Sequence, residues 1–236
     1  PYTYDDANSE WQLQNVHATL SPSDNASGVT ATYYCIDTDN SCTPATSGTT
    51  ADITCSANST CQKYLRYYST DLAGNQETTR SRLIRIDKQA PATPDVNAEG
   101  SESSDLVLTY AYSTNDYSGS GVNDFYLELR TGSTDGNLAY AAWTGDSDGS
   151  YEYSGALEAY TYYARGKVRD AVGQESGFSD WSSGTYINST SHPASSNYAL
   201  DIYTVEPSDQ VSSSNYSIYD LVVGQPSVSM ESTNYS

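Results

Sequence analysis

Short segments of alternating apolar and polar residues, separated by clusters of turn-forming residues, constrain this chain more than any other feature. A period of two residues is that of a β-strand with one buried face. Successive segments start roughly every ten residues or somewhat more, a spacing typical of an antiparallel sandwich. In the first part of the chain, the expected strands are 16–24, 31–37, 51–56, 62–71 and 81–87.

A second series of such segments follows a short interruption. Residues 88–96 contain two prolines, which break strand pairing and indicate a stiff linker. The chain has 23 Tyr and 16 Gly and is rich in Ser and Thr, which favours strands and turns over helices. The expected strands after the linker are 106–113, 124–130, 138–144, 150–155, 159–170 and 184–188.

These patterns predict an all-β fold of two tandem antiparallel β-sandwiches with a C-terminal β-strand tail. The expected boundaries are 1–90 for the first sandwich, 91–188 for the second, and 189–236 for a linker and the tail.

The cysteines occur only in the first predicted sandwich, at Cys35, Cys42, Cys55 and Cys61. Successive pairs enclose six and five residues, whereas zinc sites favour spacers of about two to four residues, and no His is near. We therefore expect disulfides 35–42 and 55–61. Disulfides indicate a secreted, extracellular or cell-surface protein, unless the source is a hyperthermophile.

Asn-x-Ser/Thr sequons, which are glycosylation sites in exported proteins, support the same location. The sequence does not start with Met and has no evident signal peptide or transmembrane segment, so we expect a mature or trimmed product. The formal net charge of −20 disfavours nucleic acid and anionic membranes as partners. The sequons are Asn25, Asn58, Asn188, Asn215 and Asn234.

An internal repeat places an acidic, glycine-containing turn at equivalent points of the two sandwiches. Residues 24–29 are echoed by 116–122, and residues 71–77 by 170–175. We expect Asp71 and Asp170 to accept hydrogen bonds from turn amides. A weaker alternative is Ca²⁺ binding, which needs several clustered oxygens. The candidates are Asp24, Asp71, Asp116 and Asp170.

The motifs LSPSDNASGV, TYYCIDTDNSC and YLRYYSTDLAGNQE resemble the immunoglobulin-like repeats of large bacterial and archaeal surface proteins. The motifs TPDV and YYARGKVRDAVGQESGFSDWSS resemble a fibronectin type III domain, with Tyr110 or Tyr112 in place of the Trp usual in its second strand. The S-S-N-Y-x-[LI] pattern of the tail resembles short repeats near the C-termini of similar surface proteins. These resemblances imply spacers, adhesins or fibre subunits without catalysis of their own.

The sequence offers no constellation for catalysis, and we expect no enzyme activity. Nucleophilic catalysis usually needs a His as base, but only His17 and His192 occur, and neither lies near a nucleophile motif. We expect instead a structural ladder, that is, a stack of alternating aromatic and arginine side chains. In it Trp181 lies between Arg165 and Arg169, because the two arginines share one strand face. A sugar-binding Trp platform is the alternative.

The sequence of the tail predicts β-strands that pair with another sheet. Residues 189–236 contain no Lys or Arg, so the charges that normally block strand pairing are missing. Tyr216, Ile218 and Val222 share one face of an extended segment, and Tyr219, Leu221 and Val223 share the other. The residues expected to exchange between subunits are Tyr216, Ile218, Leu221, Val222, Val223, Val228 and Met230.

These features predict a pilus-like structural subunit of an extracellular filament or cell-surface fibre, a homopolymer assembled by strand donation. One alternative is an adhesin or surface-layer spacer that binds glycans or cells. Another is a set of accessory domains from a larger secreted enzyme. The tail itself has an alternative interpretation, as a small third β-domain that is cut short.

Overall fold

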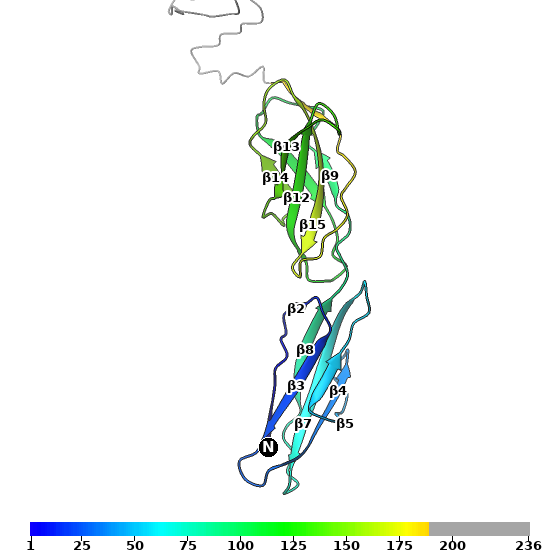
Figure 1. Ribbon diagram of the computed structural model, residues 1–236, viewed down its shortest axis with the longest axis vertical. Coiled ribbons are helices and arrows are strands. Elements are labelled where there is room, and N and C mark those ends of the chain that lie inside the picture. Colours follow the sequence, from blue (N-terminus) through cyan, green and yellow to red (C-terminus); the bar gives the residue numbers. More distant parts are fainter. Residues whose placement is uncertain (189–236) are drawn as a thin grey trace, which may run out of the picture. The chain divides into compact units, whose positions relative to one another are not determined.

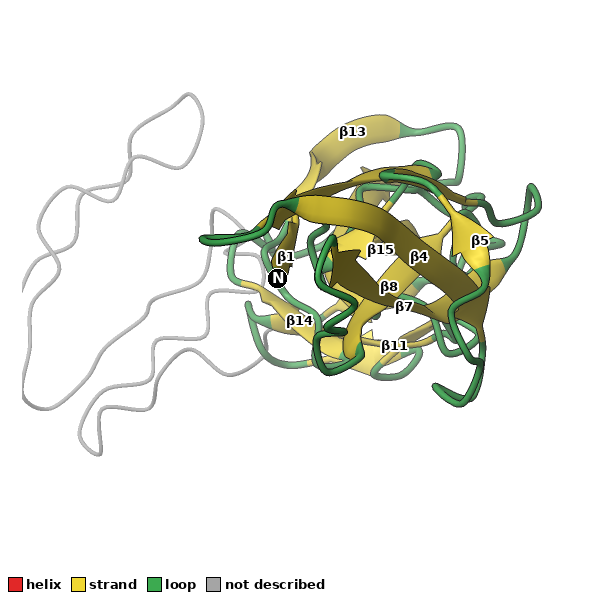
Figure 2. Ribbon diagram, turned by 90° about the horizontal axis from the view of Figure 1, so that it is seen from below, coloured by secondary structure: helices red, strands yellow, loops and turns green. Residues whose placement is uncertain are grey.

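The computed structural model describes residues 1–188, which contain strands and no helix (Figures 1 and 2). The predictions for the tail, including His192, Asn215, Asn234 and the strand-exchange residues, lie outside this range. The strands are β1 (Tyr2–Asp5), β2 (Trp11–Gln12), β3 (Val16–Ser23), β4 (Val29–Asp37), β5 (Thr46–Ser47), β6 (Thr50–Ile53), β7 (Thr60–Asp71), β8 (Arg80–Asp87), β9 (Asp95–Ala98), β10 (Glu102–Ser103), β11 (Leu108–Ser113), β12 (Val122–Thr131), β13 (Asn137–Trp143), β14 (Ser150–Tyr153), β15 (Thr161–Asp170) and β16 (Thr185–Ile187).

The first sandwich consists of a three-stranded sheet in the order β1-β3-β6 and a five-stranded sheet in the order β2-β8-β7-β4-β5. Alternate residues of β7 are buried, as the sequence period predicts for a half-buried strand. The core of the first sandwich contains Leu20 and Ile53 from the smaller sheet and Leu65, Ile84 and Ile86 from the larger one, each at most 1% exposed.

The second sandwich repeats this arrangement, with sheets in the orders β14-β11-β9 and β10-β16-β15-β12-β13. Its core is separate from the first and is built around Phe125, Leu127 and Leu129 of β12. Tyr112 lies on β11, which pairs with the first strand β9, and stacks on Phe125 with 4.0 Å between ring centroids. A tyrosine therefore occupies the core from the strand where the resemblance expects Trp.

The structure contains strands that the sequence patterns do not indicate, namely β1, β2, β5, β9 and β10. β9 begins at Asp95, inside the segment predicted as a linker, directly after Pro94. As an edge strand, β9 tolerates the neighbouring proline, because only one of its edges must pair. The expected boundaries of 1–90 and 91–188 stay predictions.

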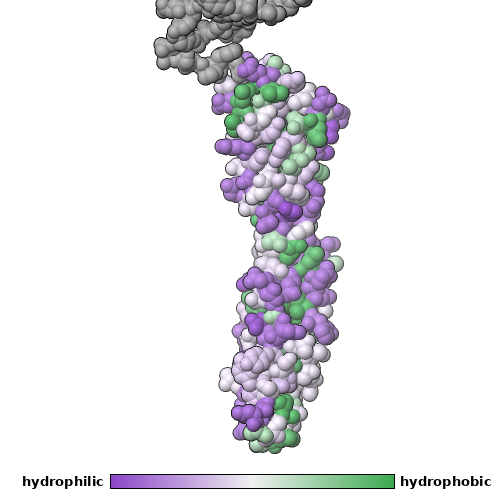
Figure 3. Space-filling view, turned by 60° about the vertical axis from the view of Figure 1, so that its left-hand side comes forward, coloured by the Kyte–Doolittle hydropathy of each residue, from purple (hydrophilic) through white to green (hydrophobic). Residues whose placement is uncertain are grey.

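Both expected disulfides are present, Cys35–Cys42 and Cys55–Cys61. Asn25, Asn58 and Asn188 are exposed, so these sequons are accessible to modification, and their glycosylation stays a prediction. Within residues 1–188 there is no helix of the length and apolar character that crossing a membrane requires. On the face shown in Figure 3, hydrophobic residues form small groups among hydrophilic ones.

Candidate functional site

Three carboxylates that are far apart in the sequence come together in the folded chain. Asp87 is the last residue of β8, Asp116 lies in the turn before β12, and Asp170 is the last residue of β15. Each offers one oxygen within 4.8 Å of the others. Asp87 belongs to the first sandwich and the other two to the second. We call these three residues the carboxylate cluster.

Asp87 is completely buried and is held by three hydrogen bonds. One carboxylate oxygen accepts a bond from the Thr60 hydroxyl at 3.1 Å and from the Gln89 amide at 3.1 Å. The other accepts a bond from the Ser120 amide at 2.6 Å. Because Ser120 follows Asp116 in the same turn, this last bond connects Asp87 to the turn of the second sandwich.

The other two carboxylates fold their own turns. Asp170, 1% exposed, accepts hydrogen bonds from the amides of Val172 at 3.0 Å and Gln174 at 2.8 Å. Asp116 accepts a bond from the Gly121 amide at 2.5 Å through one oxygen. Its other oxygen is buried and has no hydrogen-bond partner among the described residues.

The cluster is short of positive charge. No ion pair joins any of its three members to a Lys or Arg of residues 1–188, and the nearest cation in sequence, Lys88, bonds to Asn15 and to the Cys55 carbonyl. Burial raises the pKa of Asp116 to about 6; the Gly121 amide opposes this rise, and the charges of Asp87 and Asp170 add to it. Burial also raises the pKa of Asp170.

This chemistry suits a hard divalent cation. Ca²⁺ takes six to eight oxygen ligands in flexible geometry, and carboxylates are its usual protein donors. The unpartnered oxygen of Asp116 and the hydroxyl of Ser120, which is also buried without a partner, are further oxygens in the same turn. A bound cation would compensate the mutual repulsion that otherwise favours the protonated form of Asp116.

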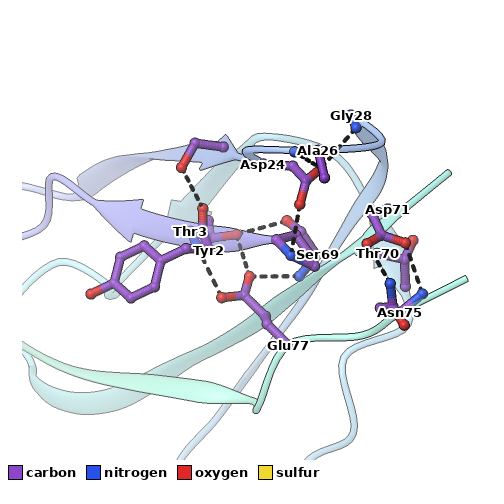
Figure 4. A network of polar contacts seen from close by, with 12 residues as sticks. Tyr2, Thr3, Asp24, Ala26, Gly28, Ser69, Thr70, Asp71, Asn75 and Glu77 are labelled. Atoms are coloured by element: carbon purple, nitrogen blue, oxygen red, sulfur yellow. Dashed lines mark hydrogen bonds and ion pairs between the residues drawn. The ribbon is translucent and has the colours of Figure 1, made fainter. Parts of the chain in front are cut away.

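The four candidates from the sequence divide between the two sandwiches. Asp116 and Asp170 belong to the cluster, whereas Asp24 and Asp71 fold turns at the equivalent end of the first sandwich (Figure 4). The amides of Gly28 and Ala26 lower the pKa of Asp24 to about 2. Asp71 accepts two bonds from Asn75, both at 2.8 Å. The sequence favours a turn-forming role for Asp71 and Asp170, and both accept hydrogen bonds from the amides of their own turns.

Asp87 is absent from the sequence-based candidates because no turn motif surrounds it. One signal existed, since Asp87 ends a predicted strand at the junction with the linker. Only the folded chain shows that this strand end meets the turns of residues 116–121 and 170–174, through the hydrogen bonds of Asp87 with Ser120 and Gln174.

A second polar network in the first sandwich ties its N-terminal strand to β7 (Figure 4). Glu77 accepts hydrogen bonds from the amides of Thr3 at 3.0 Å and Ser69 at 2.8 Å, and from the Thr3 hydroxyl. The hydroxyls of Thr3 and Ser69 lie 2.7 Å apart. The residue at the position of Glu77 in the second sandwich is Ser176, whose hydroxyl accepts a hydrogen bond from the Val168 amide at 3.0 Å. Glu175, which the sequence repeat aligns with Glu77, lies at the position of Gln76 and pairs with Lys167.

The aromatic ladder is present with a different order from the one predicted. The Arg165 guanidinium lies 4.6 Å from the centroid of the Trp181 ring, as expected. The other arginine near Trp181 is Arg130, at 5.9 Å. Arg169 lies over Trp143 at 4.4 Å, so its predicted place on Trp181 was wrong. Trp143 comes from β13, two strands away from β15 in the sheet, which strand spacing within β15 cannot reveal.

A buried carboxylate, that of Glu128, holds two arginines of the ladder in place. Glu128, 6% exposed, forms ion pairs with Arg130 and with Arg165, both at 2.8 Å. The arginines thus have a carboxylate on one side and an aromatic face on the other, which is the arrangement of a structural stack. The exposed His17 pairs with Asp52 at 2.6 Å, and no nucleophile is among its hydrogen-bond partners.

The order of the strands places both halves of residues 1–188 in the class of immunoglobulin-like and fibronectin type III-like β-sandwiches. No family model matches the chain, and no curated protein matches it in sequence.

Three solved structures illustrate the similarity in fold. The fibronectin(III)-like modules of Clostridium thermocellum CbhA are 13% identical, with a TM-score of 0.38, and the match covers 79% of this chain and 94% of that one. Domains from titin are 11% identical (TM-score 0.46, covering 78% and 65%), and the chicken CNTN1 FN1-FN3 domains are 14% identical (TM-score 0.38, covering 75% and 62%). The chain thus spans less than two thirds of the last two structures.

Proposed function

We propose that this chain is a structural subunit of an extracellular filament or cell-surface fibre, in which the tail of one copy completes a sheet of the next. The observation that carries the proposal is the sequence of the tail. Leu221, Val222 and Val223 are apolar on both strand faces, within a stretch of 48 residues that has no Lys or Arg. Such a segment suits the interior of a sheet.

The two sandwiches support this proposal because each has a hydrophobic core of its own. Each core is built from residues within 1–188, so both have a complete interior of their own. The two disulfides are consistent with an extracellular location. Donation of a strand from one copy to the next is a head-to-tail contact that does not close on itself, which produces a linear polymer.

Electron microscopy of the purified full chain tests this function. We expect regular filaments from the natural chain and none after deletion of residues 206–236. Circular dichroism and thermal unfolding of the deletion variant provide the control, because both sandwiches should stay folded. Isolated particles of the natural chain, or filaments that persist after the deletion, would contradict the proposal.

A surface spacer is the second candidate, and the carboxylate cluster favours it. We propose that Ca²⁺ binds Asp87, Asp116 and Asp170 and so connects the last strand of the first sandwich to two turns of the second. Calorimetric titration with CaCl₂ tests this site against the Asp116→Asn variant. We expect a binding isotherm for the natural chain and a large loss of affinity in the variant. Equal isotherms, or no heat in either, would exclude the site.

A further inference from the structure

The strands at the edges of the four sheets differ in their protection against pairing with another chain. Charged residues on an edge strand normally prevent such pairing. Five edge strands are longer than two residues: β1, β6, β9, β13 and β14. Four of them contain a carboxylate: Asp5, Asp52, Asp95 and Glu152. β13, with the sequence NLAYAAW, contains neither a charged residue nor a proline.

β13 is also the longest of these edges, with seven residues. It pairs with β12 on one side, and no strand of residues 1–188 pairs with its other side. A β-bulge leaves Ala139 without a partner on β12. Bulges at sheet edges redirect side chains, and here Ala139 lines a cavity beside the strand.

The cavity lies between β13 of one sheet and β14 of the other, at the side of the sandwich where both sheets end. Its volume is about 260 Å³. Its lining is mixed: Ala139 from β13, Tyr153 from β14, and Leu157 and Tyr160 from the segment that follows lie beside the polar residues Thr131 and Asn137. A cavity of roughly 150 Å³ holds a benzene-sized ring, so this one accommodates a large apolar side chain.

Large hydrophobic side chains are exposed at this cavity and on the edge strand. Leu157 and Tyr160, which line the cavity, are 61% and 47% exposed, and Leu138 of β13 is 59% exposed. An uncharged strand edge beside a hollow with such side chains offers an added strand both backbone partners and side-chain contacts. The strand's backbone pairs with the edge, and alternate side chains enter the hollow.

The tail of this chain contains a segment that fits these requirements. In residues 215–223, an extended backbone puts Tyr219, Leu221 and Val223 on one face and Asp220 on the other. Burial of an unpaired carboxylate is costly, so Asp220 must face solvent. The face of the strand is thereby chosen, with Tyr219, Leu221 and Val223 directed toward the cavity.

We propose that the edge of β13 and the adjoining cavity accept residues 215–223 from a second copy of this chain. The inference rests on the proposed filament function and adds to it the acceptor sheet and the face of the donor strand that is buried. The acceptor edge lacks any charge, and the one charged residue of the donor segment, Asp220, faces solvent in this arrangement, so no ionic group opposes their contact.

Two full-length variants test the acceptor and the donor separately. Leu157→Asp puts a charge at the mouth of the cavity, on a side chain that is already 61% exposed. Leu221→Asp puts a charge in the donor segment. The matched control is Leu72→Asp, the same substitution at a leucine that is 71% exposed in the first sandwich. Leu138→Asp is a second acceptor variant, and thermal unfolding of each variant confirms that it folds.

We expect polymer from the natural chain and from Leu72→Asp, and monomers from Leu157→Asp and Leu221→Asp alone. A mixture of these two monomeric variants should give a dimer of one copy of each, because one retains a donor and the other an acceptor. Sedimentation velocity measures both outcomes.

The failures of the two proposals are distinguishable. If the natural chain itself stays monomeric, the filament function fails, and the second-copy acceptor fails with it. If the natural chain, Leu157→Asp and Leu138→Asp all polymerise, the filament stands and β13 is not its acceptor. If the two variants stay monomeric when mixed, the pairing of these two segments is refuted.

Discussion

Replacement of Asp116 by Asn should stabilise the protein at neutral pH when no divalent cation is present. Burial raises the pKa of Asp116 from 3.8 to about 6, so the folded chain holds a proton there more tightly than the unfolded chain does. The stabilisation from this proton is complete below pH about 4 and is lost as the pH rises through about 6. At pH 7 the folded chain carries the unfavourable charge, which Asn removes while its side-chain oxygen still accepts the Gly121 amide.

The pKa change sets the size of the effect. One pKa unit corresponds to about 1.4 kcal/mol, so an increase of roughly two units gives at most about 3 kcal/mol. Asp116 is partly exposed, and screening by water reduces this to about 1–2 kcal/mol. For a chain of this size the melting temperature should rise by roughly 3–6 °C.

Thermal unfolding in EDTA at pH 5 and pH 7 measures the effect, with Asp135→Asn at an exposed position as the control. The gain should be present at pH 7 and smaller at pH 5. In Ca²⁺ the order should reverse, because a ligand at a hundred times its Kd stabilises the natural chain by about 2.7 kcal/mol. A variant that is less stable than the natural chain at pH 7 in EDTA would refute the reasoning.

Three further changes test other parts of the structure. Glu77→Ala should destabilise the first sandwich by about 3 kcal/mol, because the Ser69 and Thr3 amides lose their acceptor; urea unfolding measures this, and Glu77→Gln should restore part of it. Glu128→Ala should cost about 2 kcal/mol by leaving Arg130 and Arg165 without their carboxylate. Burial raises the pKa of Glu128, but hydrogen bonds from the two arginines outweigh it and lower the pKa overall. The stability lost in Glu128→Ala should therefore be measurable above pH about 4.5 and disappear on acidification. Equal losses of stability at pH 3 and pH 7 would contradict it. Replacement of both Cys55 and Cys61 by Ser should cost about 2 kcal/mol, the value for a loop this short, and an unchanged urea midpoint would show that the bond does not constrain the unfolded chain.

The sequence predicts the long, regular strands well, because their periodicity is a local property. Buried residues alternate with half-buried ones over all ten residues of β15 and from Leu65 to Asp71 in β7. The two-residue strands β2 and β5 have no period to recognise, and they pair only because a neighbouring sheet edge is available.

The candidate site is predictable in part, for the same physical reason. Asp116 and Asp170 stand out because their turns repeat the turns of Asp24 and Asp71 along the chain. Asp87 and the stacking of Trp143 on Arg169 depend on contacts between residues far apart in sequence, which no local pattern encodes. The cavity beside β13 likewise forms only when two sheets end at the same side.

In each sandwich, a parallel pair of strands determines how the fold resists a mechanical force. β2 is parallel to β8, and β10 is parallel to β16, so in each sandwich a strand from the beginning of the fold lies beside one from its end, running in the same direction. When such a pair is pulled by its opposite chain ends, the strands slide along one another, and the hydrogen bonds between them bear the load together. In antiparallel pairs pulled from one end, the bonds would break one after another. Each disulfide spans only six or seven positions in sequence, so it keeps little of the chain from extending when the ends of the first sandwich are pulled, and tension would load the parallel pair.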